Sequence, residues 1–146
     1  MKAKKILLVE DSPDDQELIR MAIEEEHIAN EIVALSDGVQ ALDYLFGRGA
    51  YTGRDLSDKP LVILLDIKLP KVNGLEVLQQ LRDDPRTSLI PVVILTSSNE
   101  EQDILTSYKN RVNSYVRKPV DFKQFSEAVK QLQLYWVILN EPPPDG

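Results

Sequence analysis

Carboxylates follow two apolar runs of the chain directly. Glu10 and Asp11 come after the run at residues 6–9, and Asp66 closes the run at residues 61–65. Short, fully apolar runs that contain Val or Ile are typical of strands buried on both faces of a parallel sheet. Ligands of open parallel sheets bind at the carboxyl ends of the strands. We therefore expect the three carboxylates to converge on one pocket.

Three carboxylates in one pocket repel one another unless a cation neutralises them. The chain has no cysteine and no histidine near these positions, so oxygen ligands and Mg²⁺ are expected, with Mn²⁺ as a substitute. Thr96 ends the fourth apolar run, and Lys118 follows the fifth. A hydroxyl, an ammonium group and a divalent cation beside Asp66 favour phosphoryl transfer to that carboxylate, because this reaction depends on positioning and charge neutralisation.

Each of these residues also has an ordinary structural explanation. An aspartate at a strand end is common as a helix cap or turn former, Thr96 by itself is a turn hydroxyl, and Lys118-Pro119 by itself marks a turn. The functional interpretation depends on their conjunction, since every one follows or ends a predicted strand. His27, the single histidine, is interpreted as a solvated helix-end residue, because a relay through it would need a helical bundle.

Five apolar runs alternate with helical patterns along the chain. Strands are expected at residues 5–9, 32–35, 61–66, 91–95 and 113–116. Helices are expected after each of them, the last at about 121–140. The alternation predicts the α/β class, with a doubly wound five-stranded parallel sheet, helices on both faces and right-handed crossovers. The loop at 47–60 is long for such a domain, and long loops are often functional.

Composition narrows the classes of function. The 146 residues include 17 basic and 24 acidic side chains, and a net charge of −7 argues against nucleic acid as a direct partner. No apolar stretch approaches the roughly 20 residues of a membrane-spanning helix, and the first apolar run is too short for a signal peptide. We expect a cytoplasmic protein with one domain at 1–140 and a flexible, proline-rich tail at 141–146.

The chain resembles the receiver domain of two-component response regulators over roughly residues 4 to 135. The motif residues are Glu10-Asp11, Asp66, Pro70, Gly74, Thr96, Tyr115 and Lys118-Pro119. The resemblance implies a flavodoxin-like three-layer sandwich in which Asp66 accepts a phosphoryl group from a sensor histidine kinase. It also implies that Mg²⁺ is held by Glu10, Asp11, Asp66 and the backbone carbonyl of Lys68.

The resemblance assigns further roles around the phosphoryl group. Lys118 and Thr96 contact it, Thr96 and Tyr115 form a switch pair, and the peptide before Pro119 is cis, which costs only about 0.5–1 kcal/mol before proline. Such a chain is a phospho-accepting signalling domain, capable at most of slow self-dephosphorylation, and not an enzyme. The long loop at 47–60, the long last helix and the acidic stretch at 10–15 resemble the single-domain regulators of cyanobacterial phytochromes, which implies a phytochrome as the kinase.

The end of the last helix predicts a second contact surface. Residues 134–139 are apolar on every side of a helix, and one sheet cannot cover all of those sides. We expect a two-fold homodimer interface at Tyr135, Trp136, Val137 and Ile138. The alternative is that this end packs on its own domain. With no output domain expected, signalling is expected to pass through contact with a downstream protein of unknown identity.

Three other functions remain alternatives at this point. An aspartyl-phosphate phosphatase on a similar sheet would carry a second aspartate two residues after Asp66, where this chain has Lys68. A flavin or nucleotide carrier would need a phosphate-binding loop rich in glycine or hydroxyls in place of Glu10-Asp11. The third alternative is an interaction module of the same fold that works without phosphate.

Overall fold

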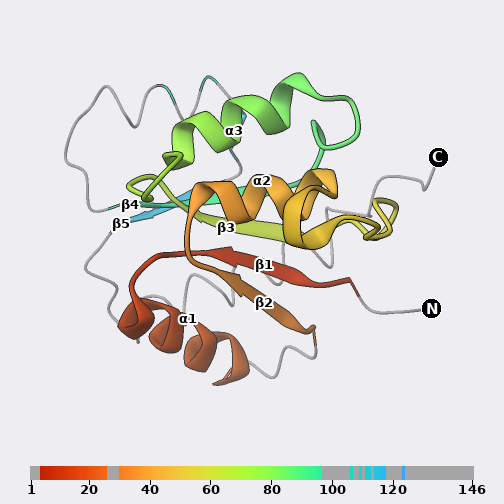
Figure 1. Cartoon of the computed structure of the whole chain (residues 1–146). Helices are drawn as coiled ribbons and strands as arrows, with labels where there is room; N and C mark the ends of the chain where they lie inside the picture. The colour runs from red at the N-terminus through yellow and green to blue at the C-terminus, as the bar shows by residue number, and fades with distance from the viewer. Residues whose placement is uncertain are drawn as a thin grey trace.

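A five-stranded parallel sheet forms the centre of the protein (Figure 1). The structure is a computed structural model that describes residues 4–25, 30–96, 106, 109, 111–112, 114–117 and 123. The strands are β1 (Ile6–Val9), β2 (Ile32–Leu35), β3 (Val62–Asp66), β4 (Val92–Thr96) and β5 (Ser114–Arg117). The helices are α1 (Pro13–Glu25), α2 (Gly38–Phe46) and α3 (Gly74–Asp83), with a short 3₁₀ helix η1 (Gly49–Tyr51).

The strand order is β2-β1-β3-β4-β5, and every neighbouring pair is parallel. From β1 the chain moves outward to β2, then returns to β3 on the other side of β1 and continues outward to β5. The reversal therefore lies between β1 and β3, which is the position where open α/β sheets bind ligands. The expected doubly wound parallel sheet is confirmed.

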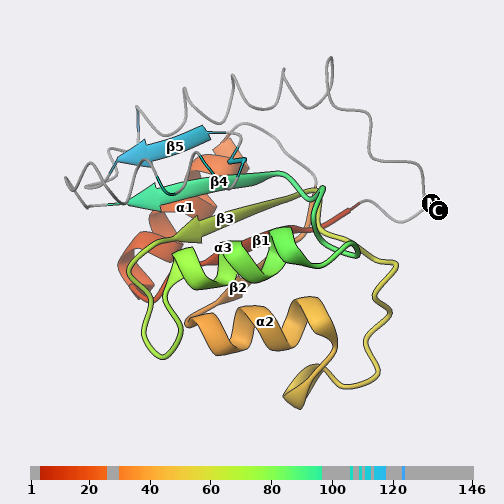
Figure 2. The ribbon, with the colours of Figure 1, turned by 90° about the horizontal axis from the view of Figure 1, so that it is seen from above.

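The sheet is covered on both faces, as Figures 1 and 2 show, with α2 and α3 on one side and α1 on the other. Every residue of β1 and β3 is buried. Alternate residues of these strands face opposite helices: Leu7 and Ile63 pack in the cluster with α2 and α3, whereas Leu8 and Leu64 pack with α1. Covering both faces explains why these strands are continuous apolar runs.

Polar side chains at the helix starts bind the first free N–H groups. Asp37 accepts a hydrogen bond from the Gln40 N–H (2.8 Å), and Asn73 accepts one from the Glu76 N–H (2.9 Å). Ser12 accepts one from the Asp15 N–H at 3.3 Å. Such caps satisfy backbone donors that have no partner within the helix. They fix the starts of three helices, each of which follows the carboxyl end of a strand.

The long loop at 47–60 is folded around Arg54. The Arg54 Nε donates to the Tyr44 carbonyl (2.6 Å) and a second guanidinium nitrogen donates to the Asp58 carbonyl (3.0 Å). The same guanidinium lies 4.1 Å from the centre of the Tyr44 ring, against which Tyr51 packs edge-on at 5.1 Å. Bonds from one side chain to backbone carbonyls leave no periodic pattern in a sequence, so the sequence predicts only a loop here.

Several expected features lie outside the described residues. These are the tail at 141–146, His27 and, apart from isolated positions, the helices expected after the strand at 91–95 and near 121–140. Within the described part of the chain, no helix combines the length and apolar character that crossing a membrane requires.

Candidate functional site

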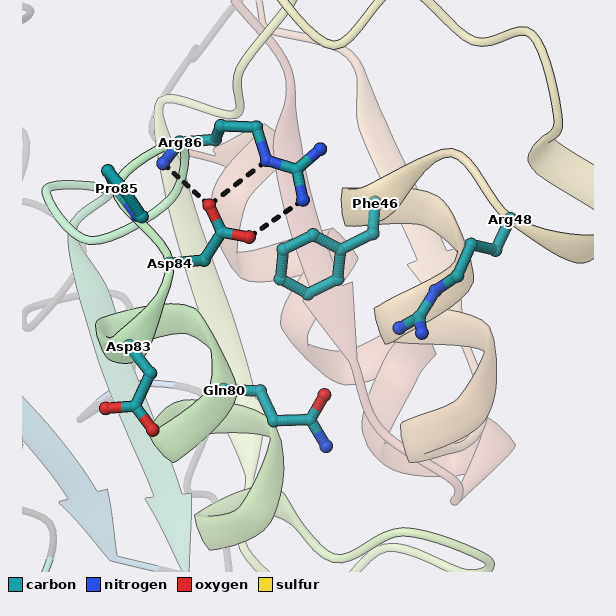
Figure 3. A pocket seen from close by; sticks show the side chains of 7 residues that line it. All are labelled: Phe46, Arg48, Gln80, Asp83, Asp84, Pro85 and Arg86. Carbon is teal, nitrogen blue, oxygen red and sulfur yellow. Dashed lines mark hydrogen bonds and ion pairs between the residues drawn. The ribbon is translucent and has the colours of Figure 1, made fainter.

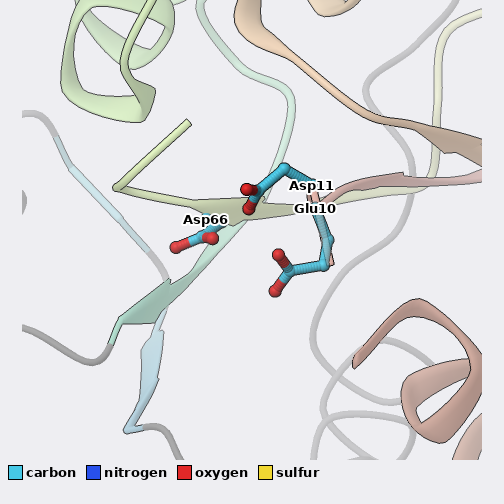
Figure 4. Close-up of side chains that lie close together, drawn as sticks. All are labelled: Glu10, Asp11 and Asp66. Atoms are coloured by element: carbon cyan, nitrogen blue, oxygen red, sulfur yellow. The ribbon is translucent and has the colours of Figure 1, made fainter. Parts of the chain in front are cut away.

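Three carboxylates gather at the ends of β1 and β3 (Figure 4). Glu10, Asp11 and Asp66 each place a carboxylate oxygen within 4.8 Å of the others. The strand register explains the meeting, because Val9 pairs with Leu65 and the next residues are therefore Glu10 and Asp66. Glu10 (0% exposed) and Asp66 (3%) are buried, whereas Asp11 is exposed. The cluster thus reaches the surface through Asp11.

Local hydrogen bonds hold the buried carboxylates in place. Asp66 Oδ1 accepts from the Lys68 N–H (3.2 Å), and Glu10 Oε2 accepts from the Ser12 N–H (3.1 Å). The Glu10 backbone is fixed on both sides, because its N–H donates to the Leu35 carbonyl (3.0 Å) and its carbonyl accepts from Gln16 Nε2. Sequence reasoning missed this role of Gln16, since a polar residue on a helix is ordinary and carries no distinguishing signal.

The donor set fits a hard divalent cation. All three donors are carboxylate oxygens, and no histidine or cysteine joins this group among the described residues. Ligands on opposite sides of Mg²⁺ lie about 4 Å apart, so small side-chain movements would close the cluster on an ion. Burying two of these carboxylates in one place is unfavourable without a compensating positive charge. The geometry therefore matches the ligand preference of Mg²⁺ or Mn²⁺.

The loop after Asp66 packs closely against the backbone of Asp66. The Ile67 N–H donates to the Leu95 carbonyl (3.1 Å), and the Gly74 N–H donates to the Ile67 carbonyl (2.7 Å). A Cβ added at Gly74 would lie 2.0 Å from the Asp66 carbonyl oxygen. No side chain fits at position 74 without displacing the backbone of Asp66, which gives the Gly74 of the motif a physical reason.

The other predicted site residues are distributed beyond this cluster. Thr96 is the last residue of β4, one position past the Leu95 that pairs with Asp66, and Tyr115 pairs with Ile94 on the neighbouring β5. The two residues of the proposed switch pair therefore stand on adjacent strands. The remaining predicted positions lie outside the described residues: Lys118, Pro119, Tyr135, Trp136, Val137 and Ile138.

An open pocket of about 420 Å³ lies between the C-terminal ends of α2 and α3 (Figure 3). Asp84 accepts three hydrogen bonds from Arg86 there, at 2.7–3.1 Å. The side-chain bonds from Arg86 make the largest contribution, and the backbone bond the next, to lowering the pKa of Asp84 to about 2. The Phe46 ring lies 5.3 Å from each of the Arg48 and Arg86 guanidinium groups. No predicted site residue lines this pocket.

Comparison with known proteins gives consistent matches across the chain. The sequence profile of the response regulator receiver domain matches residues 6–130, a span that includes the clustered carboxylates. The response regulator Rcp1 of Synechocystis sp. is 38% identical over 92% of this chain and 89% of its own length. The Mn(2+)-bound form of Rcp1 has a solved structure that aligns at a TM-score of 0.83, 36% identity, and coverage of 97% of this chain and 99% of that chain.

Two further solved structures are similar over nearly the whole chain. The bacteriophytochrome response regulator RtBRR is 53% identical, with a TM-score of 0.81 and coverage of 99% of this chain and 86% of that one. The phosphorylated cyanobacterial phytochrome response regulator RcpA is 38% identical, with a TM-score of 0.84 and coverage of 97% and 99% respectively. These likenesses therefore rest on sequence and fold together.

Proposed function

Because the chain belongs to the response regulator receiver domain family, we propose that Asp66 accepts a phosphoryl group from a sensor histidine kinase in a Mg²⁺-dependent reaction. The observation that carries this proposal is the cluster of Glu10, Asp11 and Asp66 within 4.8 Å at the reversal point of the sheet. Lys68, two residues after Asp66, argues against the phosphatase, and Glu10-Asp11 at the end of β1 argues against the flavin or nucleotide carrier. The chain acts as a phospho-accepting signalling domain, with at most slow self-dephosphorylation.

The transfer is a single displacement at phosphorus. A carboxylate oxygen of Asp66 forms the new P–O bond while the P–N bond of the kinase phosphohistidine breaks, and the imidazole nitrogen leaves with the electron pair and takes up a proton. Glu10, Asp11, Asp66 and the Lys68 carbonyl would hold Mg²⁺, or Mn²⁺ in its place, which would neutralise charge on the phosphoryl oxygens. Lys118 and Thr96 bind the phosphoryl oxygens, the first as a cation and the second as a hydroxyl donor.

The phosphorylated state differs from the free state chiefly in local charge. The phosphoryl group adds about −1.5 to −2 charges, and Thr96 moves toward it to donate a hydrogen bond. Tyr115, on the neighbouring strand, then takes the space that Thr96 leaves. The group needs only to bind one of two existing conformations better for the population to shift.

Acetyl phosphate provides the test of this function. With Mg²⁺ present, we expect intact-mass measurement to show one added phosphoryl group, mapped to Asp66 after proteolysis. Asp66→Asn should abolish the label, whereas Asp83→Asn, an exposed aspartate at the end of α3, should retain it. Labelling of Asp66→Asn at the wild-type rate contradicts the proposal. A wild-type chain that takes up neither phosphoryl nor beryllium fluoride would instead favour the phosphate-independent interaction module.

The kinase is proposed to be a phytochrome. RtBRR and RcpA are both named as phytochrome response regulators, and both align over almost all of this chain. Phosphotransfer from a phytochrome kinase to Asp66, faster than from an unrelated histidine kinase, is the expected result. Equal or slower transfer from the phytochrome contradicts the pairing. The reaction is proposed to take place in the cytoplasm.

Output is proposed to pass through protein contacts, including a homodimer formed by the last helix. The support is the apolar stretch that contains Tyr135, Trp136, Val137 and Ile138. The combined variant Tyr135→Ala and Val137→Ser should sediment as a monomer under conditions in which the wild-type chain is a dimer. An unchanged dimer in that variant contradicts this interface. The proposal concerns this mode of output and no particular downstream protein.

A further inference from the structure

The loop between β3 and α3, residues 67–73, touches the first residue of α2. The Gly38 N–H donates to the Pro70 carbonyl at 3.4 Å. A Cβ added at Gly38 would lie 1.9 Å from the Val72 carbonyl oxygen and 2.7 Å from the Val72 carbonyl carbon. Gly38 is buried and is absent from the glycines with positive φ in the described chain. Close approach of two backbones, not an unusual φ, therefore requires glycine at this position.

A charged pair lies beside this backbone contact. The Asp37 carboxylate, whose side chain is 8% exposed, lies 3.6 Å from the Lys71 ammonium nitrogen and also caps α2 through the Gln40 N–H. Lys71 has a φ of +68°, a conformation that few residues other than glycine adopt. Because the Lys71 side chain is 66% exposed, the ion pair contributes little on its own. It adds a second, weaker link between α2 and the loop.

The loop is also fixed where it leaves β3 and where it enters α3. The Lys68 N–H donates to Asp66 Oδ1 (3.2 Å), and the Gly74 N–H donates to the Ile67 carbonyl (2.7 Å). Along the chain, Lys68, whose carbonyl is proposed to bind Mg²⁺, therefore lies between Asp66 and the residues that contact Gly38. In the middle of the loop, Leu69 is buried in the core and the Val72 N–H donates to the Pro70 carbonyl (2.8 Å), and the Gly38 contact ties this part of the loop to α2.

We infer that Gly38 is a positioning residue for the metal site, because its lack of a side chain lets the 67–73 loop keep the position in which Lys68 is bonded to Asp66. The inference rests on the proposed function, since it assumes that Mg²⁺ binds beside Asp66. A methyl group at position 38 pushes on the Val72 backbone, which has no rotamer by which to move aside. The loop then shifts relative to Glu10 and Asp66, which are anchored on β1 and β3.

The Mg²⁺ dependence of labelling by acetyl phosphate tests this inference in Gly38→Ala. We expect the half-saturating Mg²⁺ concentration to rise about tenfold, the lower end of what supporting residues of metal sites contribute. The maximal rate at saturating Mg²⁺ should return to near the wild-type value, and calorimetry should show the same loss of Mg²⁺ affinity. If Gly38 had a merely structural role, Gly38→Ala would lower stability but would not raise the half-saturating Mg²⁺ concentration while keeping the maximal rate. Val39→Ala, in the same turn at a 37% exposed position, should leave the Mg²⁺ dependence unchanged.

The outcomes separate the inference from the proposed function. No Mg²⁺ binding by the wild-type chain overturns both, whereas equal Mg²⁺ affinity of wild type and Gly38→Ala overturns the positioning role alone. If Gly38→Ala lacks the wild-type circular dichroism spectrum, Asp37→Asn combined with Lys71→Ala replaces it. That pair of substitutions keeps an asparagine cap on α2 and removes only the ion pair. It should raise the half-saturating Mg²⁺ concentration roughly threefold, and no change there overturns the wider claim that contact with α2 positions the loop.

Discussion

The three carboxylates of the site differ in how firmly they are held. Glu10 and Asp66 are buried and accept hydrogen bonds from backbone N–H groups close in sequence, whereas Asp11 is exposed. Buried, anchored groups keep their position when a ligand arrives, so little ordering is needed to bind one. We therefore expect Glu10 and Asp66 to define where the cation sits, and Asp11 to close on it from the solvent side.

Thr96 provides a prediction about the switch. In Thr96→Ala, the acceptor and the carboxylates are intact, so labelling of Asp66 by acetyl phosphate should persist. The alanine cannot donate a hydrogen bond to the phosphoryl group, so the change in association that follows phosphorylation should weaken. Sedimentation with and without acetyl phosphate measures that change. The same phosphorylation-dependent association in Thr96→Ala as in wild type would refute the role of this hydroxyl.

Arg82 provides a prediction about stability. Its guanidinium donates to the carbonyls of Ser88 (3.0 Å), Ile90 (2.9 Å) and Arg111 (3.0 Å). Burial is the main cause that lowers the pKa of Arg82 to about 10, and the nearby Arg111 charge is the smaller cause. The group therefore stays protonated at neutral pH. Arg82→Met should lower the free energy of unfolding by about 2–3 kcal/mol, because it removes these donors. Urea titration measures the free energy of unfolding. The control Arg48→Met, at an exposed position, should change that free energy by less than about 0.5 kcal/mol. An equal effect of Arg82→Met and Arg48→Met refutes the prediction.

At the scale of elements, β3 positions Asp66, the proposed phosphoacceptor, by being buried on both faces. Leu65, next to Asp66, is 0% exposed, whereas Leu89 is 67% exposed. Leu65→Ala should therefore lower the free energy of unfolding by about 3 kcal/mol through lost burial and a cavity. The same truncation at Leu89 should cost less than about 0.5 kcal/mol. Chemical denaturation measures both, and a small effect at Leu65 would contradict the packing described for β3.

The loop at 47–60 depends on Arg54 for its shape. Arg54→Leu removes the bonds to the Tyr44 and Asp58 carbonyls, so chymotrypsin should cut at Tyr51 and Leu56 faster than in wild type. Lys59→Ala, a change in the same loop that leaves the Arg54 bonds intact, should be cut at the wild-type rate. Equal cleavage of Arg54→Leu and wild type would show that other contacts hold the loop.

The strands could be predicted from the sequence because both faces of the sheet are covered. The expected strand at 61–66 differs from β3 by one residue, since Leu61 precedes the ladder and is only half-buried. The meeting of Glu10 with Asp66 also follows from the apolar runs once the strands are parallel. By contrast, the contact between Gly38 and Val72 joins residues far apart in the sequence, and the bonds of Arg54 join loop residues at no regular spacing. No local pattern encodes such contacts, so they could not be predicted.

At the scale of the molecule, topology and charge bring the site together. The reversal between β1 and β3 places the ends of both strands beside each other, and each end carries acidic residues. The net charge of −7 adds a general attraction for cations. The fold therefore concentrates negative charge around Asp66, the proposed phosphoacceptor, and the free energy of unfolding should depend on the cation.

The melting temperature with and without Mg²⁺ tests this central claim most directly. At 100 times the dissociation constant, Mg²⁺ should stabilise the wild-type chain by about 2.7 kcal/mol, which is about 8 °C for a domain of this size. Asp11→Asn should respond much less, and in EDTA it should melt no lower than wild type because one repelling charge is gone. Asp83→Asn should respond like wild type. A wild-type melting temperature equal in Mg²⁺ and in EDTA would contradict the account.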